Sequence, residues 1–495
     1  MKPALLSIAF CLGLYGATAQ SSLPNQVRKV NPPAVALQPL HFLAADELMG
    51  RSTTRPEIHV AARYISEQFR SFGLKPAPGA ADYFQTFDLK MSKPAHSGGF
   101  TVGGTTYAFG EQLLPTGVED VSLQAPVVYA GWGSKEDFEK LDVKGAIVVT
   151  NMGRHDSSTF MEGYRATAAK RKLAADKGAV ALVERFREAG TSWTDVQHYL
   201  LGERVASSAP SGGLPVLMLN DKDTPVVPLL KGSITATLSI GGNRVDAMPA
   251  RNVIGMVEGT DPKLKGQYIV LSAHYDHVGV AAQPRVVDGK PDSIYNGARD
   301  NAVGVAAVIN AARYFARHPA KRSILFVAYT GEEMGMVGSQ HFVANPPVPL
   351  ERMVYNLNID NAGYNDTTIV TVIGLGRTSA DADIKRGAAA FGLTAIADPA
   401  PEQGLFDRSD NAALAFKGIP APTYSLGFRQ FDRAITNHYH QVSDEVGSFN
   451  LSYALKYMNS FILAAKYIAD NPAQPVWQKG DKYEAAWKEL YKKPL

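Results

Sequence analysis

Four short runs of apolar residues alternate with helical patterns in the second half of the chain, and they restrict the fold more than any other feature. The runs cover residues 267–273, 323–329, 353–359 and 422–426. Helical spacing of apolar residues follows the first run, at 301–317, and follows the last run, at 453–468. Strands that are apolar on both faces and alternate with helices are typical of parallel sheets covered on both sides. We therefore predict an α/β fold with a mostly parallel mixed sheet flanked by helices.

The rest of the chain predicts a second domain. A chain of 495 residues is longer than a single core usually supports. Residues 35–75 have helical spacing up to Gly73, whereas short strands and turns without a catalytic pattern fill about 123–240. We expect a signal peptide at 1–19, a catalytic domain at 20–118 and 249–472, an inserted smaller α/β domain at 119–248 and a C-terminal tail at 473–495.

The first residues have the layout of a secretory signal peptide. Lys2 precedes an apolar stretch at 4–15, and the small residues 17–19 follow it. The stretch is shorter than the roughly 20 residues of a membrane span, so we expect export to the periplasm or the extracellular space, without an integral membrane segment after cleavage. Lipoprotein processing at Cys11 is a less favoured alternative.

Composition narrows the chemistry. Cys11 is the only cysteine and lies in the predicted signal peptide, which excludes thiol catalysis and leaves His, Asp and Glu as metal ligands. The formal charge of +3 and the scattered basic residues argue against a nucleic-acid partner.

Ionisable residues directly follow three of the predicted strands. Because the carboxyl ends of parallel strands meet at one edge of a sheet, these side chains should lie close together. A further Asp begins the helix at 301–317, and a His lies beyond the fourth run. The set comprises His274 and Asp276, Glu332 and Glu333, Asp360, Asp300 and His440.

Each of these residues alone has an ordinary structural explanation. Asp300 could cap its helix, Glu332 and Glu333 could form an acidic first turn, and His274 could be a core histidine. Together, however, clustered carboxylates would repel one another unless cations neutralise them. The combination predicts a site for two divalent metal ions.

Five segments carry a resemblance to a known family: 274–279 (HYDHVG), 300–304 (DNAVG), 331–333 (GEE), 358–360 (NID) and 440–444 (HQVSD). In order and spacing they resemble the co-catalytic zinc aminopeptidases grouped with glutamate carboxypeptidase. The stretch at 119–248 resembles the protease-associated domain that is often inserted in such chains.

The resemblance implies a role for each matched residue. It places His274 and Asp360 on one zinc ion, Glu333 and His440 on the other, and Asp300 between both. Glu332 becomes the general base, and Asp276 accepts a hydrogen bond from the outer nitrogen of His274. The resemblance also implies a cis peptide bond after Asp300, and it makes Asp410 and Tyr439 candidate substrate-pocket residues. Other divalent metals than zinc fit the same ligands.

The expected function is an exported aminopeptidase that hydrolyses N-terminal residues from peptides with two Zn²⁺ ions. Two residues depart from common forms of the pattern, Arg299 and Asn361, and they bear on substrate preference. A carboxypeptidase is the main alternative, since Arg299, Arg408 and Arg429 could bind a substrate carboxylate. Single-zinc glutaminyl cyclisation and a non-catalytic binding protein of this fold are less favoured.

Overall fold

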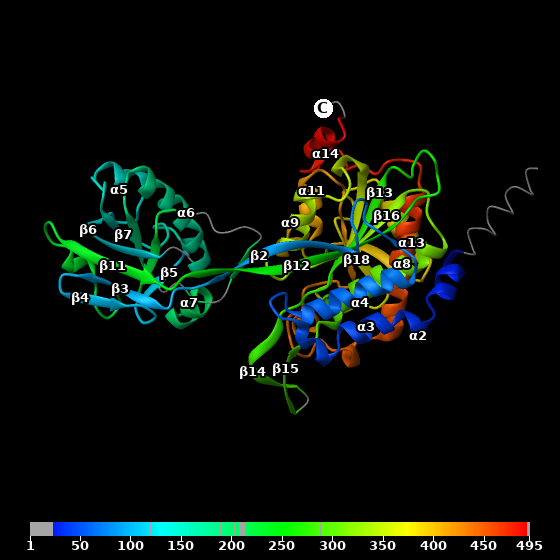
Figure 1. The fold of residues 1–495 in the computed structure, drawn as a ribbon, viewed down its shortest axis with the longest axis horizontal. Helices are drawn as coiled ribbons and strands as arrows, with labels where there is room; N and C mark the ends of the chain where they lie inside the picture. Colours follow the sequence, from blue (N-terminus) through cyan, green and yellow to red (C-terminus); the bar gives the residue numbers. More distant parts are fainter. Residues whose placement is uncertain are drawn as a thin grey trace, which may run out of the picture. The chain divides into compact units, whose positions relative to one another are not determined.

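The computed structural model describes residues 23–117, 120–157, 159–187, 190–201, 204–206, 213–287 and 289–492. The predicted signal peptide at 1–19 lies outside these residues. The chain divides into two compact units, unit 1 with Met1–Phe87 and Pro249–Leu495, and unit 2 with Asp88–Met248 (Figure 1).

A mixed sheet forms the centre of unit 1. Its strands lie in the order β19 (Thr394–Ala397), β18 (Ile369–Ile373), β20 (Thr423–Leu426), β17 (Met353–Ile359), β13 (Tyr268–His274), β16 (Ser323–Tyr329) and β12 (Arg244–Val257). The four central strands β20, β17, β13 and β16 run parallel, whereas β18 and β12 pair antiparallel with their neighbours β20 and β16. The predicted fold class is confirmed.

Both faces of this sheet are buried, which explains why its strands are continuously apolar. In β13, Ile269 and Leu271 belong to one core and Val270 to another, because successive side chains point to opposite faces. Helices α4 (Glu57–Ser71), α8 (Val303–Arg317) and α13 (Leu451–Asp470) pack into the first core. Helices α9 (Val337–Ala344) and α11 (Asn411–Phe416) pack into the second.

The N-terminal helical region is broken where the sequence predicts a continuous pattern. It contains α2 (Pro33–Ala36), α3 (Gln38–Leu43), a 3-10 turn at Asp46–Arg51 and then α4. Met49, Gly50 and Arg51 all have positive φ, which a helix cannot contain. As predicted, the helix stops at Gly73, where φ is 79°.

A β-hairpin that the sequence did not predict follows β13. It consists of β14 (Gly279–Val287) and β15 (Lys290–Tyr295) and lies between the HYDH segment and Asp300. Unit 1 also contains β1 (Lys75–Pro76), α10 (Asp381–Ala389) and α12 (Arg433–Thr436).

The predicted C-terminal tail is part of unit 1. Trp477 and Tyr483 are buried in the second core, and the indole nitrogen of Trp477 donates to the carbonyl oxygen of Gly418 at 3.0 Å. Helix α14 (Glu484–Leu490) follows them. The segment predicted as a C-terminal tail at 473–495 is therefore part of the folded unit up to residue 492. Two buried aromatic side chains anchor it, although its composition is rich in Lys.

Unit 2 has its own sheet and begins earlier than the expected residue 119. Strands β3 (Ser97–Val102) and β4 (Thr105–Ala108) extend this sheet through β11 (Thr235–Gly241), so residues from Asp88 onward belong to the insert. The full order is β4, β3, β11, β6 (Val121–Tyr129), β7 (Ile147–Asn151), β8 (Ala181–Arg185), β10 (Val216–Leu219) and β5 (Leu113–Pro115). Its helices are α5 (Lys135–Glu139), α6 (Phe160–Asp176) and α7 (Trp193–Leu200), while β9 (Arg204–Ala206) pairs with β2 (Phe84–Lys93).

In the described part of the chain, no helix combines the length and the apolar composition needed to cross a membrane.

Candidate metal centre

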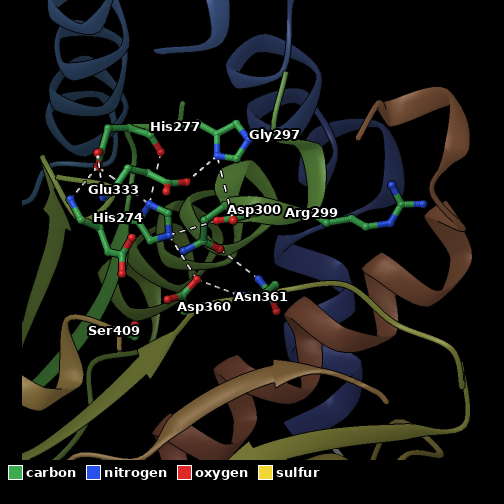
Figure 2. A network of polar contacts seen from close by, with 12 residues as sticks. His274, His277, Gly297, Arg299, Asp300, Glu333, Asp360, Asn361 and Ser409 are labelled. Atoms are coloured by element: carbon green, nitrogen blue, oxygen red, sulfur yellow. Dashed lines mark hydrogen bonds and ion pairs between the residues drawn. The ribbon is translucent and has the colours of Figure 1, made fainter. Parts of the chain in front are cut away.

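Three adjacent parallel strands bring the predicted residues to one edge of the sheet. His274 is the last residue of β13, Asp360 directly follows β17, and Glu332 and Glu333 follow β16 after two residues. The register pairs His274 with Tyr329, which ends β16, so the three strands end at the same level. Figure 2 shows the resulting cluster, with Asp300 at its centre.

The first group of side chains contains His274, Asp300 and Asp360. Nε2 of His274 lies 3.1 Å from Oδ1 of Asp360 and 3.2 Å from Oδ1 of Asp300 (Figure 2). All three come from the set that the sequence predicts, and the histidine is almost fully buried.

The second group uses the other oxygen of Asp300. Nε2 of His440 lies 3.2 Å from Oδ2 of Asp300 and 3.2 Å from Oε2 of Glu333. His277 belongs to this group as well, with Nδ1 2.7 Å from Oε1 of Glu333. No role was predicted for His277 from the sequence, although it lies only three residues after the end of β13.

Asp444 holds the backbone of the Asp300 turn against the loop that carries His440. Its carboxylate accepts hydrogen bonds from the backbone N–H of Arg299 (3.0 Å) and of Asp300 (3.1 Å), and its carbonyl accepts from Ala298 (3.0 Å). The Asp300–Asn301 peptide bond is cis, as the resemblance implies.

Asp276 has a different partner from the predicted one. Its carboxylate lies 3.8 Å from Nδ1 of His274, which is too long for a hydrogen bond. Nδ1 lies instead 3.2 Å from the carbonyl oxygen of Asp276. The carboxylate accepts from Thr53 and from the backbone N–H groups of Glu332 and Glu333. Asp276 thus supports the histidine with its backbone and the two glutamates with its side chain.

Arg51 is a buried cation that supports the same edge and that sequence reasoning missed. Its guanidinium donates to the carbonyl oxygens of Tyr275 (2.8 Å), Asn296 (2.6 Å), Gly297 (3.1 Å) and Leu43. Tyr275 follows His274, and Gly297 precedes the Asp300 turn. Bonds to backbone carbonyls leave no sequence pattern, so only the structure reveals this role.

The electrostatics of the site favour bound positive charge. Burial opposes the imidazolium form of His440, but hydrogen bonds to Asp300 and Glu333 raise its pKa to about 10. Burial and Asp300 act to raise the pKa of Glu333, yet its hydrogen bonds with His277 and His440 hold it at about 2. The carboxylates of Asp300 and Glu333 thus stabilise positive charge on His440.

Glu332 differs from its neighbour Glu333. Burial, followed by the charges of Asp360 and Asp410, raises the pKa of Glu332 well above its ordinary value, despite the opposing effect of His274. A raised pKa is a property that many catalytic acids and bases share.

A cavity of about 60 Å³ opens beside the two groups. Its lining includes the carboxyl groups of Asp300, Glu332 and Asp360 and four larger apolar or aromatic side chains, those of Ile373, Leu405, Phe428 and Tyr439. Tyr439, predicted as a candidate substrate-pocket residue, is among the lining residues. Asp410 is fully buried and does not line the cavity, whereas its neighbours Arg408 and Ser409 do.

The three arginines of the carboxypeptidase alternative have different surroundings. Arg299 points away from the cluster in Figure 2 and is bonded to Asp444 and Ser448. Arg429 pairs with Asp366 at 2.7 Å. Arg408 is the one of these three that lines the cavity. The other unusual residue, Asn361, also lines it and donates to Oδ1 of Asn301 at 2.9 Å.

Two known aminopeptidases are similar to this chain in sequence. Aminopeptidase YwaD of Bacillus subtilis (strain 168) is 27% identical over 246 residues, which cover 50% of this chain and 45% of that protein's length. The probable lipoprotein aminopeptidase LpqL of Mycobacterium tuberculosis (strain ATCC 25618 / H37Rv) is 25% identical over 469 residues, or 85% of this chain and 82% of LpqL.

Among solved structures, the aminopeptidase from Aneurinibacillus sp. strain AM-1 superposes with a TM-score of 0.58 at 20% identity, covering 91% of this chain and 97% of that one. This likeness shows the fold. Residues 252–464, which contain every predicted metal ligand, match peptidase family M28. Over that segment, unit 1 is similar to peptidase family M28.

Proposed function

We propose that this chain is a zinc-dependent aminopeptidase that binds two Zn²⁺ ions, one at each of the two groups of side chains described above. The observation that carries the proposal is the position of Asp300, whose two carboxylate oxygens each face a different histidine at 3.2 Å. One carboxylate shared between two ligand sets is what a pair of closely spaced metal ions requires.

The donor atoms fit zinc in type and in spacing. They are imidazole nitrogens and carboxylate oxygens, both ordinary zinc ligands. Ligands about 2.0–2.1 Å from a tetrahedral ion lie roughly 3.3 Å apart, and the distances from Nε2 of His274 and of His440 to their carboxylate partners are 3.1–3.2 Å. We propose His274 and Asp360 for one ion, Glu333 and His440 for the other, and Asp300 for both. Bound zinc would supply Lewis acidity toward a peptide carbonyl and toward water.

Glu332 is the proposed general base. It lines the cavity together with Asp300 and Asp360, so its carboxyl group can reach a molecule bound there. It would accept the proton of the attacking water and return it to the leaving amine, for which its raised pKa is suited.

One carboxyl group of the cavity lining supports binding of a substrate by its free amine. Asp300 and Asp360 are assigned to the metal ions, which leaves Glu332 as the carboxyl group of the lining that can accept a hydrogen bond from an ammonium group. The apolar side chains of the cavity lining would contact the side chain of the N-terminal residue. Arg408 is the feature that favours the second candidate, a carboxypeptidase.

Two substrate series separate these candidates. An aminopeptidase hydrolyses aminoacyl-arylamides and free-amine peptides and leaves N-acetylated peptides intact. Hydrolysis of N-acetylated peptides at their C-terminus would establish the carboxypeptidase instead. A chelator should abolish either activity.

Glu332→Gln tests the mechanism. The variant keeps the size of the side chain but cannot accept the proton, so we expect kcat to fall about 10²–10⁴-fold while zinc content stays at the wild-type level. Glu351→Gln, at an exposed position in a 3-10 turn, is the matched control and should have wild-type kcat. Wild-type kcat in Glu332→Gln would contradict the assignment.

Two further assignments rest on the sequence pattern. We propose that unit 2 is a protease-associated domain, as the resemblance of 119–248 implies, and that it begins at Asp88. We also propose export of the chain, because residues 1–19 have the pattern of a signal peptide.

A further inference from the structure

His277 is a buried histidine at the centre of the site that has no place in the proposed ligand assignment. It lies three residues after His274 and is 1% exposed. Its ring contacts Glu333, one of the proposed ligands of the second metal ion.

The two carboxylate oxygens of Glu333 have separate partners. Oε1 lies 2.7 Å from Nδ1 of His277, and Oε2 lies 3.2 Å from Nε2 of His440. The carboxylate is thus oriented with one oxygen toward His277 and the other toward the proposed metal position between His440 and Asp300.

The distances identify the first contact as a hydrogen bond. Two ligands of one tetrahedral zinc ion lie roughly 3.3 Å apart, whereas charge-assisted N–H···O bonds are about 2.7–2.9 Å long. The 2.7 Å contact between His277 and Glu333 has the length of a charge-assisted hydrogen bond. Nδ1 of His277 also lies 4.0 Å from Oδ2 of Asp300, farther than a shared ion would place it.

The ring of His277 is held in this orientation from several sides. Its backbone N–H donates to the carbonyl oxygen of Arg51 at 3.2 Å, and its ring packs edge-on against His440 with centroids 5.6 Å apart. Gly297 packs closely against it, since a Cβ atom there would lie 2.5 Å from Cδ2 of the ring. The histidine therefore has little freedom to turn away from Glu333.

The other ring nitrogen indicates where the proton lies. Nε2 of His277 is buried and has no hydrogen-bond partner among the described residues. A proton on Nε2 would be a buried donor without an acceptor, which is costly, whereas a proton on Nδ1 is bonded to Glu333. The N–H that donates to Glu333 is therefore assigned to Nδ1 of His277.

We propose that His277 is a positioning residue that orients Glu333 and thereby strengthens the second metal site relative to the first. This inference rests on the proposed two-zinc function. Removal of one group that hydrogen-bonds to a metal ligand typically lowers the metal affinity about 10–100-fold. His277 should act on the site of Glu333 and His440 and leave the site of His274 and Asp360 nearly unchanged.

The test is zinc binding to metal-free protein, measured by calorimetric titration and by zinc content after dialysis at buffered free zinc. Three substitutions separate the roles of the ring. His277→Asn places an amide N–H where Nδ1 lies, His277→Gln places it near the position of Nε2, and His277→Ala removes both. His59→Ala, in α4 and outside both ligand groups, is the control. Circular dichroism and Tm of each variant establish folding.

We expect two zinc ions per chain in the wild type, in His59→Ala and in His277→Asn. In His277→Ala and His277→Gln, one ion should bind with wild-type affinity and the other about 10–100-fold more weakly. The spectrum of cobalt bound at the second site should change in the same two variants.

Three outcomes would overturn the inference. Wild-type binding of both ions by His277→Ala would show that the hydrogen bond has no effect. Equal weakening in His277→Asn and His277→Ala would show that the ring nitrogen itself is a metal ligand. Failure of the wild type to bind two ions would overturn the proposed function, and the inference with it, before any variant is compared.

Discussion

At the scale of single residues, the proposed ligands were predictable from the sequence and the groups that hold them were not. Four of the proposed ligands follow a predicted strand or begin a predicted helix, and His440 lies beyond the fourth apolar run. The resemblance implied their ligand roles, and the structure places all five, His274, Asp300, Glu333, Asp360 and His440, in two contacting groups. The supporting contacts of Arg51, His277 and Asp444 join segments far apart in the chain. Such contacts depend on the tertiary fold and have no signature in sequence spacing.

Asp410, predicted as a candidate substrate-pocket residue, is fully buried, and its burial has a consequence for stability. It follows Ser409, which lines the cavity, but its own carboxyl group is fully buried behind the cavity. Burial raises the pKa of Asp410 to about 7. The folded chain therefore binds this proton more tightly than the unfolded chain, in which the pKa is about 3.9. Ionised Asp410 thus destabilises the fold, and this cost grows as the pH rises from about 4 to about 7.

Asp410→Asn removes this titration. We expect the free energy of unfolding of the variant, relative to wild type, to increase between pH 5 and pH 8 by on the order of a few kcal/mol. Urea unfolding of metal-free protein at the two pH values measures the difference, in which the titrations of other groups largely cancel. A difference that is independent of pH would show that Asp410 is already ionised at pH 5 in the folded chain.

At the scale of elements, the central strands were predicted almost to the residue, and the edges of the sheet were not. The apolar runs at 267–273, 323–329 and 353–359 correspond to β13, β16 and β17, because full burial leaves a continuous apolar sequence. β18 was not among the predicted strands, and its antiparallel pairing with β20 was not predicted either. Strand direction depends on the path of the intervening chain.

The turn at Ala298–Ala302 places Asp300 between the two groups of proposed metal ligands, and Gly297 directly precedes this turn. Gly297 has a φ of +58°, and an added Cβ atom would lie 2.2 Å from the carbonyl oxygen of Asp300. Gly392 has a similar φ of +74° but no neighbour within 4 Å of such an atom. The two glycines thus share a left-handed backbone conformation, but only at Gly297 would an added Cβ atom collide with neighbouring atoms.

Alanine substitutions at these two glycines distinguish the cost of the left-handed backbone from the cost of a steric clash. Gly392→Ala should lose about 1–2 kcal/mol of unfolding free energy, the cost of the left-handed conformation. Gly297→Ala should lose that amount and roughly 1–3 kcal/mol more from overpacking, and it should also bind zinc more weakly because Asp300 must move. Equal stability and equal zinc affinity in the two variants would contradict the role of Gly297.

At the scale of the whole molecule, the existence of two units was predictable and their boundary was not. Residues 88–118 contain short strands without a compositional break, and only their pairing with β11 and β10 places them in unit 2. The metal centre is formed entirely by residues of unit 1.

Zinc should therefore stabilise unit 1 selectively. Bound metal adds about 4 kcal/mol when free zinc exceeds the dissociation constant about 1,000-fold, and it relieves the repulsion among the carboxylates. We expect a chelator to lower the Tm of a calorimetric transition assigned to unit 1 and to leave the transition of unit 2 in place. Re-addition of zinc should restore the first Tm. A chelator that shifts neither transition would show that no stabilising metal is bound.

The most direct test of the two-metal site is an anomalous difference map of zinc-loaded crystals at the zinc absorption edge. We expect two peaks on either side of Asp300, roughly 3.5–4 Å apart, one beside His274 and Asp360 and the other beside Glu333 and His440. A single peak, or peaks that do not contact Asp300, would contradict the shared site.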